Sequence, residues 1–283
     1  MALFFVSAPG QAGSNRLRVI SMSPSITELL YALGADSFLV ANTKYCKFPP
    51  QTDTLPEVGG YLDPNFEAIV ALEPDLILLL KEQKDVAEKS RELGIKTLMV
   101  NHQTMSGILE SYQLIGAALG VTHGADSLTR IQSRQLAQIA DVIRDQPVPR
   151  VLVVIGHNDD SKVIKTVTVA GREKYYSDMI AAAGGVNAIT DSIVRYPQLS
   201  PEGLSAIDPD IIIDLYYAEG SEPIDSGSVQ ARWRSLPHLQ AVKNKKVFVL
   251  EGAYLAVPGP RFVRVVREFA RVIHPEVANK LPQ

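Results

Sequence analysis

The sequence predicts an α/β protein made of two Rossmann-like lobes with parallel sheets, joined by a single long α-helix. Three observations predict this fold. An eleven-residue phrase at residues 67–77 returns at residues 202–212 with the same order of residue types. Apolar runs of strand length alternate with amphipathic segments in both halves, which is typical of βα units. Between the halves lies one long helical segment with no strand signal.

Residues 17–122 are predicted to form the N-terminal lobe. Gly34 lies where the first helix would stop, and the Pro49-Pro50 pair requires a loop. The run from Leu76 to Leu80 is apolar at every position, as expected for a strand buried on both faces of its sheet. Strands are expected at 18–22, from Val40, at 76–80 and at 96–100, and the longer helices at 26–33, 85–93 and 105–119.

Residues 123–147 are predicted to form the connecting helix, and residues 148–283 the C-terminal lobe. Apolar residues at helical spacing extend to Ile143, and Pro147 ends the pattern. Because a single helix is a stiff connector, we expect limited hinge bending. The C-terminal lobe repeats the scheme of the first, with Gly184 and Gly185 ending a helix. Its strands are expected at 150–155, 211–213 and 246–250, and its longer helices at 176–183 and 260–273.

Composition narrows the function classes. The 283 residues carry a net charge of −3, which gives no electrostatic basis for binding nucleic acid. No run approaches the roughly 18 apolar residues of a membrane helix. Cys46 is the only cysteine, so an intrachain disulfide or a cysteine metal cluster is excluded. Residues 1–16 are similar to the end of a secretory signal without a lipid-anchor cysteine, so we expect an exported, soluble and monomeric periplasmic protein.

Tyrosines gather at the predicted strand exits. Ligands of parallel α/β lobes bind beyond the carboxyl ends of the strands. A tyrosine offers a flat apolar face and one polar tip, which suits a large planar or polycyclic ligand. The alternative is that these side chains are ordinary half-buried loop aromatics. The tyrosines at strand exits or next to them are Tyr45, Tyr61, Tyr196, Tyr216, Tyr217 and Tyr254.

Glu67 and Glu202 occupy equivalent positions near the start of a short helix in each lobe. An acid at that position interacts favourably with the helix dipole, which is one explanation of the pair. The functional alternative is a pair of surface acids, one per lobe, that a partner with two matching basic sockets would recognise.

Catalytic patterns are weak. The five histidines show no HxxxH or HExxH spacing, and the chain has no GxSxG or Walker sequence. The nearest polar patch is His157 with Asp159 and Asp160, so a metal-dependent enzyme centred on His157 stays open as an alternative. The sequence favours a binding protein without a catalytic site, resident metal or cofactor.

Several stretches together resemble the class III periplasmic binding proteins, the solute receptors of ABC importers for cobalamin, haem and iron-siderophores. The resemblance covers about residues 17–278, and the cobalamin-binding members are the most similar. It implies capture of cobalamin or another corrinoid between the lobes and delivery to an importer. The stretches that carry it are 18–28, 45–50, 55–60, the first copy of the repeated phrase, 258–261 and 274–276.

The resemblance also implies roles for single residues. Glu67 and Glu202 match the acids that dock onto the permease dimer, and Tyr45 matches a pocket aromatic. Leu80 stands where the family has a further aromatic, which weakens the assignment to cobalamin. The remaining implied ligand-binding positions are Tyr61, Tyr196, Tyr254 and Arg261. Haem stays an alternative because tyrosine ligates ferric haem. A ferric siderophore is a further alternative ligand, because members that bind siderophores place arginines in the cleft and Arg195 and Arg261 are candidates for that role. A sensory domain that works without a permease is an alternative function.

Overall fold

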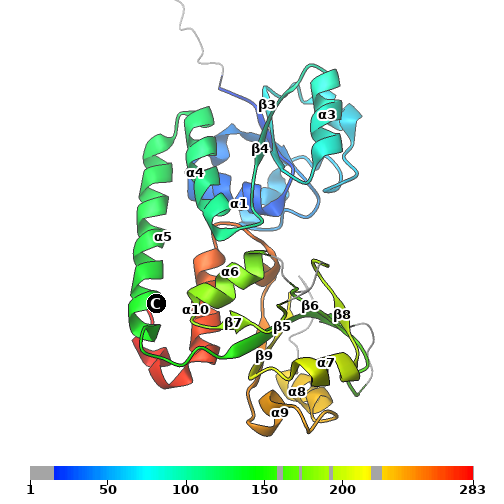
Figure 1. The fold of residues 1–283 in the computed structure, drawn as a ribbon. Helices are drawn as coiled ribbons and strands as arrows, with labels where there is room; N and C mark the ends of the chain where they lie inside the picture. Colours follow the sequence, from blue (N-terminus) through cyan, green and yellow to red (C-terminus); the bar gives the residue numbers. More distant parts are fainter. Residues whose placement is uncertain (1–15, 158–161, 172–173, 191–193, 218–224, 283) are drawn as a thin grey trace, which may run out of the picture.

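The computed structural model describes residues 16–157, 162–171, 174–190, 194–217 and 225–282. Two α/β lobes lie one above the other, and one helix, α5 (Thr122–Ile143), runs along the same side of both (Figure 1). The prediction of a single connecting helix is confirmed. Within the described residues, no helix is long and apolar enough to cross a membrane.

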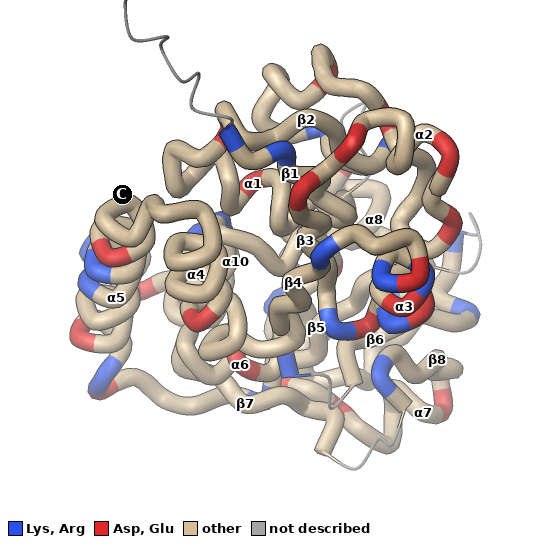
Figure 2. The backbone as a smooth tube through the Cα atoms, turned by 90° about the horizontal axis from the view of Figure 1, so that it is seen from above, with Lys and Arg blue, Asp and Glu red and all other residues tan. Residues whose placement is uncertain are grey.

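The N-terminal lobe contains a four-stranded sheet that is wholly parallel, as predicted, and its strand order is β2-β1-β3-β4. Its strands are β1 (Val19–Ser21), β2 (Leu39–Asn42), β3 (Leu76–Leu80) and β4 (Lys96–Val100). Its helices are α1 (Pro24–Ala32), α2 (Phe66–Ala71), α3 (Lys84–Glu92) and α4 (Met105–Leu119), with 3₁₀ turns η1 (Asp36–Phe38) and η2 (Pro50–Thr54). Both acidic and basic residues lie on α3 and on α5 (Figure 2).

The C-terminal sheet is mixed, which corrects the expectation of a second parallel sheet. Strands β10, β9, β5 and β7 are parallel, but β6 pairs antiparallel with β5 and β8 pairs antiparallel with β6. The two antiparallel strands are only two or three residues long, too short to show a periodic pattern. The strands are β5 (Arg150–His157), β6 (Val167–Val169), β7 (Val186–Asn187), β8 (Gln198–Leu199), β9 (Ile211–Tyr216) and β10 (Val247–Glu251).

Helix α10 (Phe262–Ile273) packs between α5 and α6 and closes the C-terminal lobe. It buries Phe262, Val266, Phe269 and Ile273, which recur at the three- to four-residue spacing of one helical face. The other helices of this lobe are α6 (Lys174–Ala182), α7 (Pro201–Ile207), α8 (Ser226–Trp233) and α9 (Gln240–Lys243), with 3₁₀ turns η3 (Ala253–Ala256) and η4 (Pro275–Lys280).

The repeated phrase forms the same local structure in both lobes. Each copy is a short helix, α2 or α7, then a turn, then a central strand, β3 or β9. The backbone N–H of Arg18 donates to Asp75 Oδ2 at 2.7 Å, and that of Arg150 donates to Asp210 Oδ2 at 2.7 Å. The aspartate of each turn therefore fixes the start of the neighbouring strand, β1 or β5.

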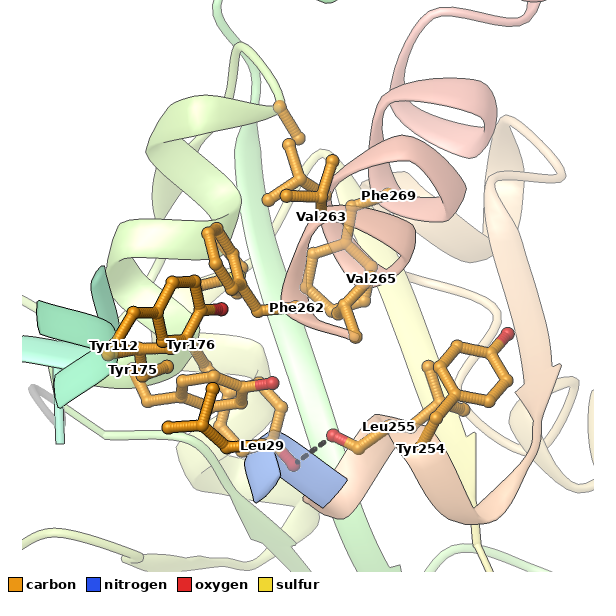
Figure 3. Close-up of a cluster of buried hydrophobic side chains, with 14 of the residues drawn as sticks. Leu29, Tyr112, Tyr175, Tyr176, Tyr254, Leu255, Phe262, Val263, Val265 and Phe269 are labelled. Atoms are coloured by element: carbon orange, nitrogen blue, oxygen red, sulfur yellow. Dashed lines mark hydrogen bonds between the residues drawn. The ribbon is translucent and has the colours of Figure 1, made fainter. Parts of the chain in front are cut away.

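One core of buried side chains runs through both lobes and the connecting helix. It includes Leu29 and Tyr112 from the N-terminal lobe, Ile139 from α5, and Phe262 and Phe269 from the C-terminal lobe. Figure 3 shows side chains from both lobes packed in this cluster. On the side of α5, the lobes therefore share apolar contacts as well as a helix.

Candidate ligand-binding cleft

A cleft of about 500 Å³ lies between the lobes. Its N-terminal wall follows the carboxyl ends of β1, β3 and β4, where ligands of parallel sheets gather. The N-terminal lobe contributes 23–25, 61–62, Leu80, Glu82 and 102–103, and the C-terminal lobe contributes 175–176, 195–196 and 256–258. The volume lies within the range of small-molecule sites in proteins, about 300–1,000 Å³.

Three of the predicted ligand-binding residues line this cleft: Tyr61, Leu80 and Tyr196. Gln83, which is buried, fixes the first two. Its side-chain amide donates to the carbonyl of Tyr61 at 2.7 Å, and its carbonyl accepts from the N–H of Leu80 at 2.8 Å. Arg195, the siderophore candidate, also lines the cleft.

The other four predicted ligand-binding residues lie outside the lining. Tyr45 is 52% exposed beside Lys44, while Tyr216 stacks on His157 with ring centroids 5.7 Å apart. Tyr254 is buried beneath the guanidinium of an α10 arginine, and Figure 3 shows it apart from the tyrosines of α6. Arg261 is ion-paired with a buried glutamate of α1. Tyr217, also singled out in the sequence, donates its hydroxyl to a carbonyl of β5.

The floor of the cleft carries a directed chain of hydrogen bonds. The hydroxyl of Ser111 donates to the carbonyl of Ile108 at 2.6 Å, so its oxygen must accept from His102 Nε2–H at 2.9 Å. His102 Nδ1 then accepts from the Ser25 hydroxyl at 2.8 Å. Ser25 Oγ in turn accepts from Ser23 Oγ at 3.0 Å. Both hydroxyl hydrogens are therefore donated within the protein, so Ser23 and Ser25 can only accept hydrogen bonds from a ligand in the cleft.

His102 keeps this floor uncharged. It is 2% exposed, and burial lowers its pKa from 6.5 to about 3. At neutral pH the ring therefore carries no charge. Among the described residues that line the cleft, Glu82 supplies the one carboxyl group and Arg195 the one guanidinium. Burial, then Glu82, raise the pKa of Tyr61 to about 12, while Arg195 lowers it, so the phenol stays protonated.

Comparisons with known proteins identify the family to which this fold belongs. The model of the periplasmic binding protein family matches residues 19–254, most of the chain. The chain belongs to this family. Its sequence is 28% identical over 258 residues to the vitamin B12-binding protein of Vibrio cholerae, covering 89% of this chain and 87% of the relative. It is 26% identical over 269 residues to an ABC transporter substrate-binding lipoprotein of Bacillus subtilis, covering 92% and 80%.

Solved structures agree with this family assignment. The periplasmic vitamin B12-binding protein of Vibrio cholerae superimposes with a TM-score of 0.76 at 26% identity, covering 93% of this chain and 97% of that one. A periplasmic heme-binding protein from Roseiflexus superimposes with a TM-score of 0.75 at 25% identity, covering 94% and 100%. The prediction of a class III periplasmic binding protein is thus confirmed, and the members that resemble it include binders of different ligands.

Sequence reasoning missed two tyrosines of this periplasmic binding protein that line the cleft. Tyr175 and Tyr176 lie in the first turn of α6, with ring centroids 5.1 Å apart at 67°. The Tyr176 hydroxyl donates to the carbonyl of Leu255 at 3.1 Å (Figure 3). A signal was available, because residues 176–184 echo α1, and the start of α1 forms the floor on the opposite lobe.

His157 does not line the cleft. Its Nε2 lies 2.9 Å from Asp214 Oδ2, and Trp233 donates to the same oxygen at 2.8 Å. Asp214 is fully buried, so these contacts supply partners that its carboxylate requires. Asp159 and Asp160, the other members of the metal-site alternative, lie outside the described residues. Among the residues that are described, no group of three or more His, Cys, Asp and Glu is placed to hold a metal ion.

Glu67 and Glu202 are exposed in the first turns of α2 and α7, the equivalent helices of the two lobes. Asn65 caps α2 and Ser200 caps α7. The Ser200 hydroxyl also donates to Glu202 Oε2 at 2.7 Å, and this hydrogen bond lowers the pKa of the Glu202 carboxyl. Both acids are therefore available on the surface, one on each lobe.

Proposed function

We propose that this protein captures a corrinoid, cobalamin or a close relative, in the cleft between its lobes and delivers it to an ABC importer. The protein acts outside the cytoplasm as a monomeric receptor. Membership of the periplasmic binding protein family supports the proposal, and so do the two relatives, one named as a vitamin B12-binding protein and one as an ABC transporter substrate-binding lipoprotein. The binding chemistry of the cleft is the single observation that favours a corrinoid within that family.

Charge balance in the cleft favours a ligand without large net charge. Among the described residues of the lining, the opposite charges of Glu82 and Arg195 offset each other, and His102 is neutral. A haem dianion or a highly charged ferric siderophore would leave uncompensated charge in a partly desolvated site, which costs free energy. Tyr61, Tyr175, Tyr176 and Tyr196 present aromatic surface to the faces of a ring ligand.

The direction of the hydrogen bonds in the floor points to the same ligand class. Ser23 and Ser25 offer oxygen lone pairs, because His102 Nδ1 requires the Ser25 hydrogen. A ligand with carboxamide N–H groups, such as a corrinoid, matches these acceptors. A carboxylate of haem would take the Ser25 hydrogen, so His102 would have to change tautomer. Ser111 would then lose its hydrogen bond to the carbonyl of Ile108, at a cost of about 0.5–1.5 kcal/mol.

Delivery rests on the two surface acids. Glu67 and Glu202 lie in equivalent first turns, so the repeated architecture sets their separation. Two basic sockets on a permease dimer would then contact both lobes at once, with ion pairs that orient the receptor and speed association.

Haem is the second candidate, favoured by the likeness to the Roseiflexus heme-binding protein and by the tyrosines of the cleft. Ligation of ferric haem by one of these tyrosines would require its tyrosinate form. The pKa of about 12 opposes this at Tyr61, so the metal would have to displace a firmly held proton. Tyr196, 41% exposed, is the more accessible ligand.

Equilibrium dialysis against an equimolar mixture of cyanocobalamin and haemin tests the proposal. We expect one cyanocobalamin retained per protein and no displacement by haemin. Retention of haemin instead, with a high-spin ferric spectrum that is lost in Tyr61→Phe or Tyr196→Phe, would establish the second candidate. Retention of neither ligand would reject both and leave the family assignment unchanged.

A further inference from the structure

Two sequence motifs that the proposed function leaves unexplained meet beneath the cleft. Glu28 ends the first motif, on α1 of the N-terminal lobe, and Arg261 ends the second, just before α10 of the C-terminal lobe. Arg261 Nε donates to Glu28 Oε2 at 2.8 Å, and its Nη2 donates to Oε1. The Glu28 side chain is 2% exposed and that of Arg261 20%. A bidentate, desolvated ion pair of this kind fixes the orientation as well as the separation of its partners.

A second contact holds the same guanidinium against the N-terminal lobe. Its central carbon lies 4.1 Å from the ring centroid of Phe48, which belongs to the loop after β2. A cation over an aromatic face at that distance is attracted by the ring. Arg261 therefore contacts two separate segments of the opposite lobe.

The two residues that precede Arg261, Gly259 and Pro260, also contact elements outside the C-terminal lobe. A Cβ on Gly259 would lie 3.1 Å from Ser25 Cα and 3.2 Å from Ser25 O, so only glycine allows this approach of the backbones without a shift. The carbonyl of Pro260 accepts from Gln132 Nε2 of α5 at 2.7 Å. Gln132 Oε1 in turn accepts from the Tyr112 hydroxyl of α4 at 2.8 Å.

We propose that Glu28, Gln132, Gly259, Pro260 and Arg261 form an interlobe joint that positions the two walls of the ligand cleft. The joint lies directly beneath the ligand site, because Ser25 and Pro258 line the cleft and adjoin its contacts. The three consecutive residues 259–261 bind α1, the connecting helix and the loop after β2. These residues set the separation of the lobes, a role that α5 alone does not perform.

The joint sets the width of the cleft before any ligand binds. A ligand that contacts Ser25 on one side and residues 256–258 on the other binds walls whose distance is already fixed. Preorganisation of this kind increases affinity, because the protein loses less conformational entropy when the ligand binds. Breaking the joint therefore lowers affinity without removing any cleft-lining side chain.

Removing one partner would leave a buried charge unpaired and risk unfolding. The test therefore uses the double variant Glu28→Gln with Arg261→Gln, which removes both charges. Its matched control is Glu268→Gln with Arg271→Gln, which removes an ion pair of α10 whose arginine side chain is 49% exposed. Spin labels at Glu88→Cys and Lys243→Cys, both exposed and one on each lobe, in a Cys46→Ala background report the interlobe distance by pulsed electron resonance.

We expect the joint variant to keep its circular dichroism spectrum but to show an interlobe distance distribution at least twofold broader than that of the parent. The control pair leaves the distribution unchanged. A folded joint variant with the parent's narrow distribution would overturn the inference. If the joint variant does not fold, Gly259→Ala decides, because its Cβ must displace Ser25; an unchanged distance there also overturns it.

The affinity readout rests on the proposed function, whereas the distance readout does not. We expect the joint variant to bind cyanocobalamin at least tenfold more weakly and the control pair to bind it as the parent does. Failure of the parent to bind cyanocobalamin would reject the proposed ligand and leave the distance comparison to decide on the joint. Parental affinity together with a broadened distribution would overturn the claim that the joint positions the ligand walls.

Discussion

At the scale of single residues, His102 links the chemistry of the cleft to the stability of the fold. The unfolded chain protonates this ring below its ordinary pKa of 6.5, but the folded protein does so only near pH 3. Between these values the unfolded state binds one more proton than the folded state, so stability falls as the pH falls.

We expect His102→Asn to flatten this dependence. Between pH 6 and pH 4 the parent should lose free energy of unfolding more steeply than the variant, by a difference approaching about 1.4 kcal/mol per pH unit. Urea unfolding at a series of pH values measures both slopes. His123→Asn, which changes an exposed histidine of α5, should retain the parental slope. Parallel slopes for the parent and His102→Asn would refute the burial argument.

The aromatic residues of the cleft yield the next prediction. Tyr61→Ala together with Tyr196→Ala should weaken cyanocobalamin binding at least tenfold, a loss of about 1.4 kcal/mol, because each removes ring contact from one wall. Isothermal titration measures the change. Tyr45→Ala is the matched control, since Tyr45 is exposed outside the lining and its loss should change affinity less than threefold. An unchanged affinity in the double variant would remove these tyrosines from the site.

At the scale of secondary-structure elements, the duplicated lobes provide a matched pair of glycines. Gly34 follows α1 at φ +68°, and a methyl group added there would have no neighbour within 4 Å among the described residues. Gly184 follows α6 at φ +82°, and a Cβ on it would lie 2.6 Å from His274 Nε2 and 3.1 Å from Ile143 Cδ1. A side chain at either position would strain the backbone, but only at Gly184 would it also contact neighbouring side chains.

Gly34→Ala should therefore cost about 1–2 kcal/mol, the penalty of a left-handed conformation. Gly184→Ala should cost about 1–3 kcal/mol more, because the methyl group must displace packed side chains. Urea unfolding of the two single variants separates strain from overpacking. Equal losses at both positions would contradict the crowding around Gly184.

The first turns of α2 and α7 carry the docking prediction. Glu67→Ala with Glu202→Ala should leave cyanocobalamin affinity at the parental value, because neither residue lines the cleft, but should lower uptake by the cognate importer at least fivefold. Glu88→Ala with Glu251→Ala, two other exposed acids, should leave uptake unchanged. Normal uptake with the first pair would exclude the docking role.

The longer helices and strands could be predicted from the sequence, because their apolar residues recur at the positions that are buried. The strand Leu76–Leu80 and the helix Met105–Leu119 agree with their predicted bounds, since continuous apolar runs and helical spacing are local signals. Strands β6 and β8 were missed because strands of only two or three residues are too short to show an apolar run or a periodic pattern.

The candidate site was only partly predictable for a related reason. Tyr61 and Tyr196, which stand just ahead of the two copies of the repeated phrase, both line the cleft, but position in the sequence does not determine the direction of a side chain. Tyr254 turns into the shared core, and Arg261 meets a carboxylate 233 positions away in the chain. Long-range partners of this kind arise from packing between lobes, and no local pattern encodes them.

At the scale of the whole molecule, the lobes are connected by more than α5. The shared core and the interlobe joint both connect the lobes, and Asp178 of α6 accepts from the N–H of Met105 at the start of α4, 2.9 Å away. These contacts add to the stiffness expected from a single helix. Ligand capture should therefore involve small changes of interlobe angle, with the walls largely in place beforehand.

Isothermal titration of the purified protein with cyanocobalamin, with haemin titrated in parallel, tests the central claim most directly. The charge-balanced cleft, its acceptor floor and its protonated Tyr61 predict saturable one-to-one binding of cyanocobalamin and much weaker binding of haemin. Saturation by haemin with no heat from cyanocobalamin would contradict the account of the ligand, and the charge and hydrogen-bond arguments with it.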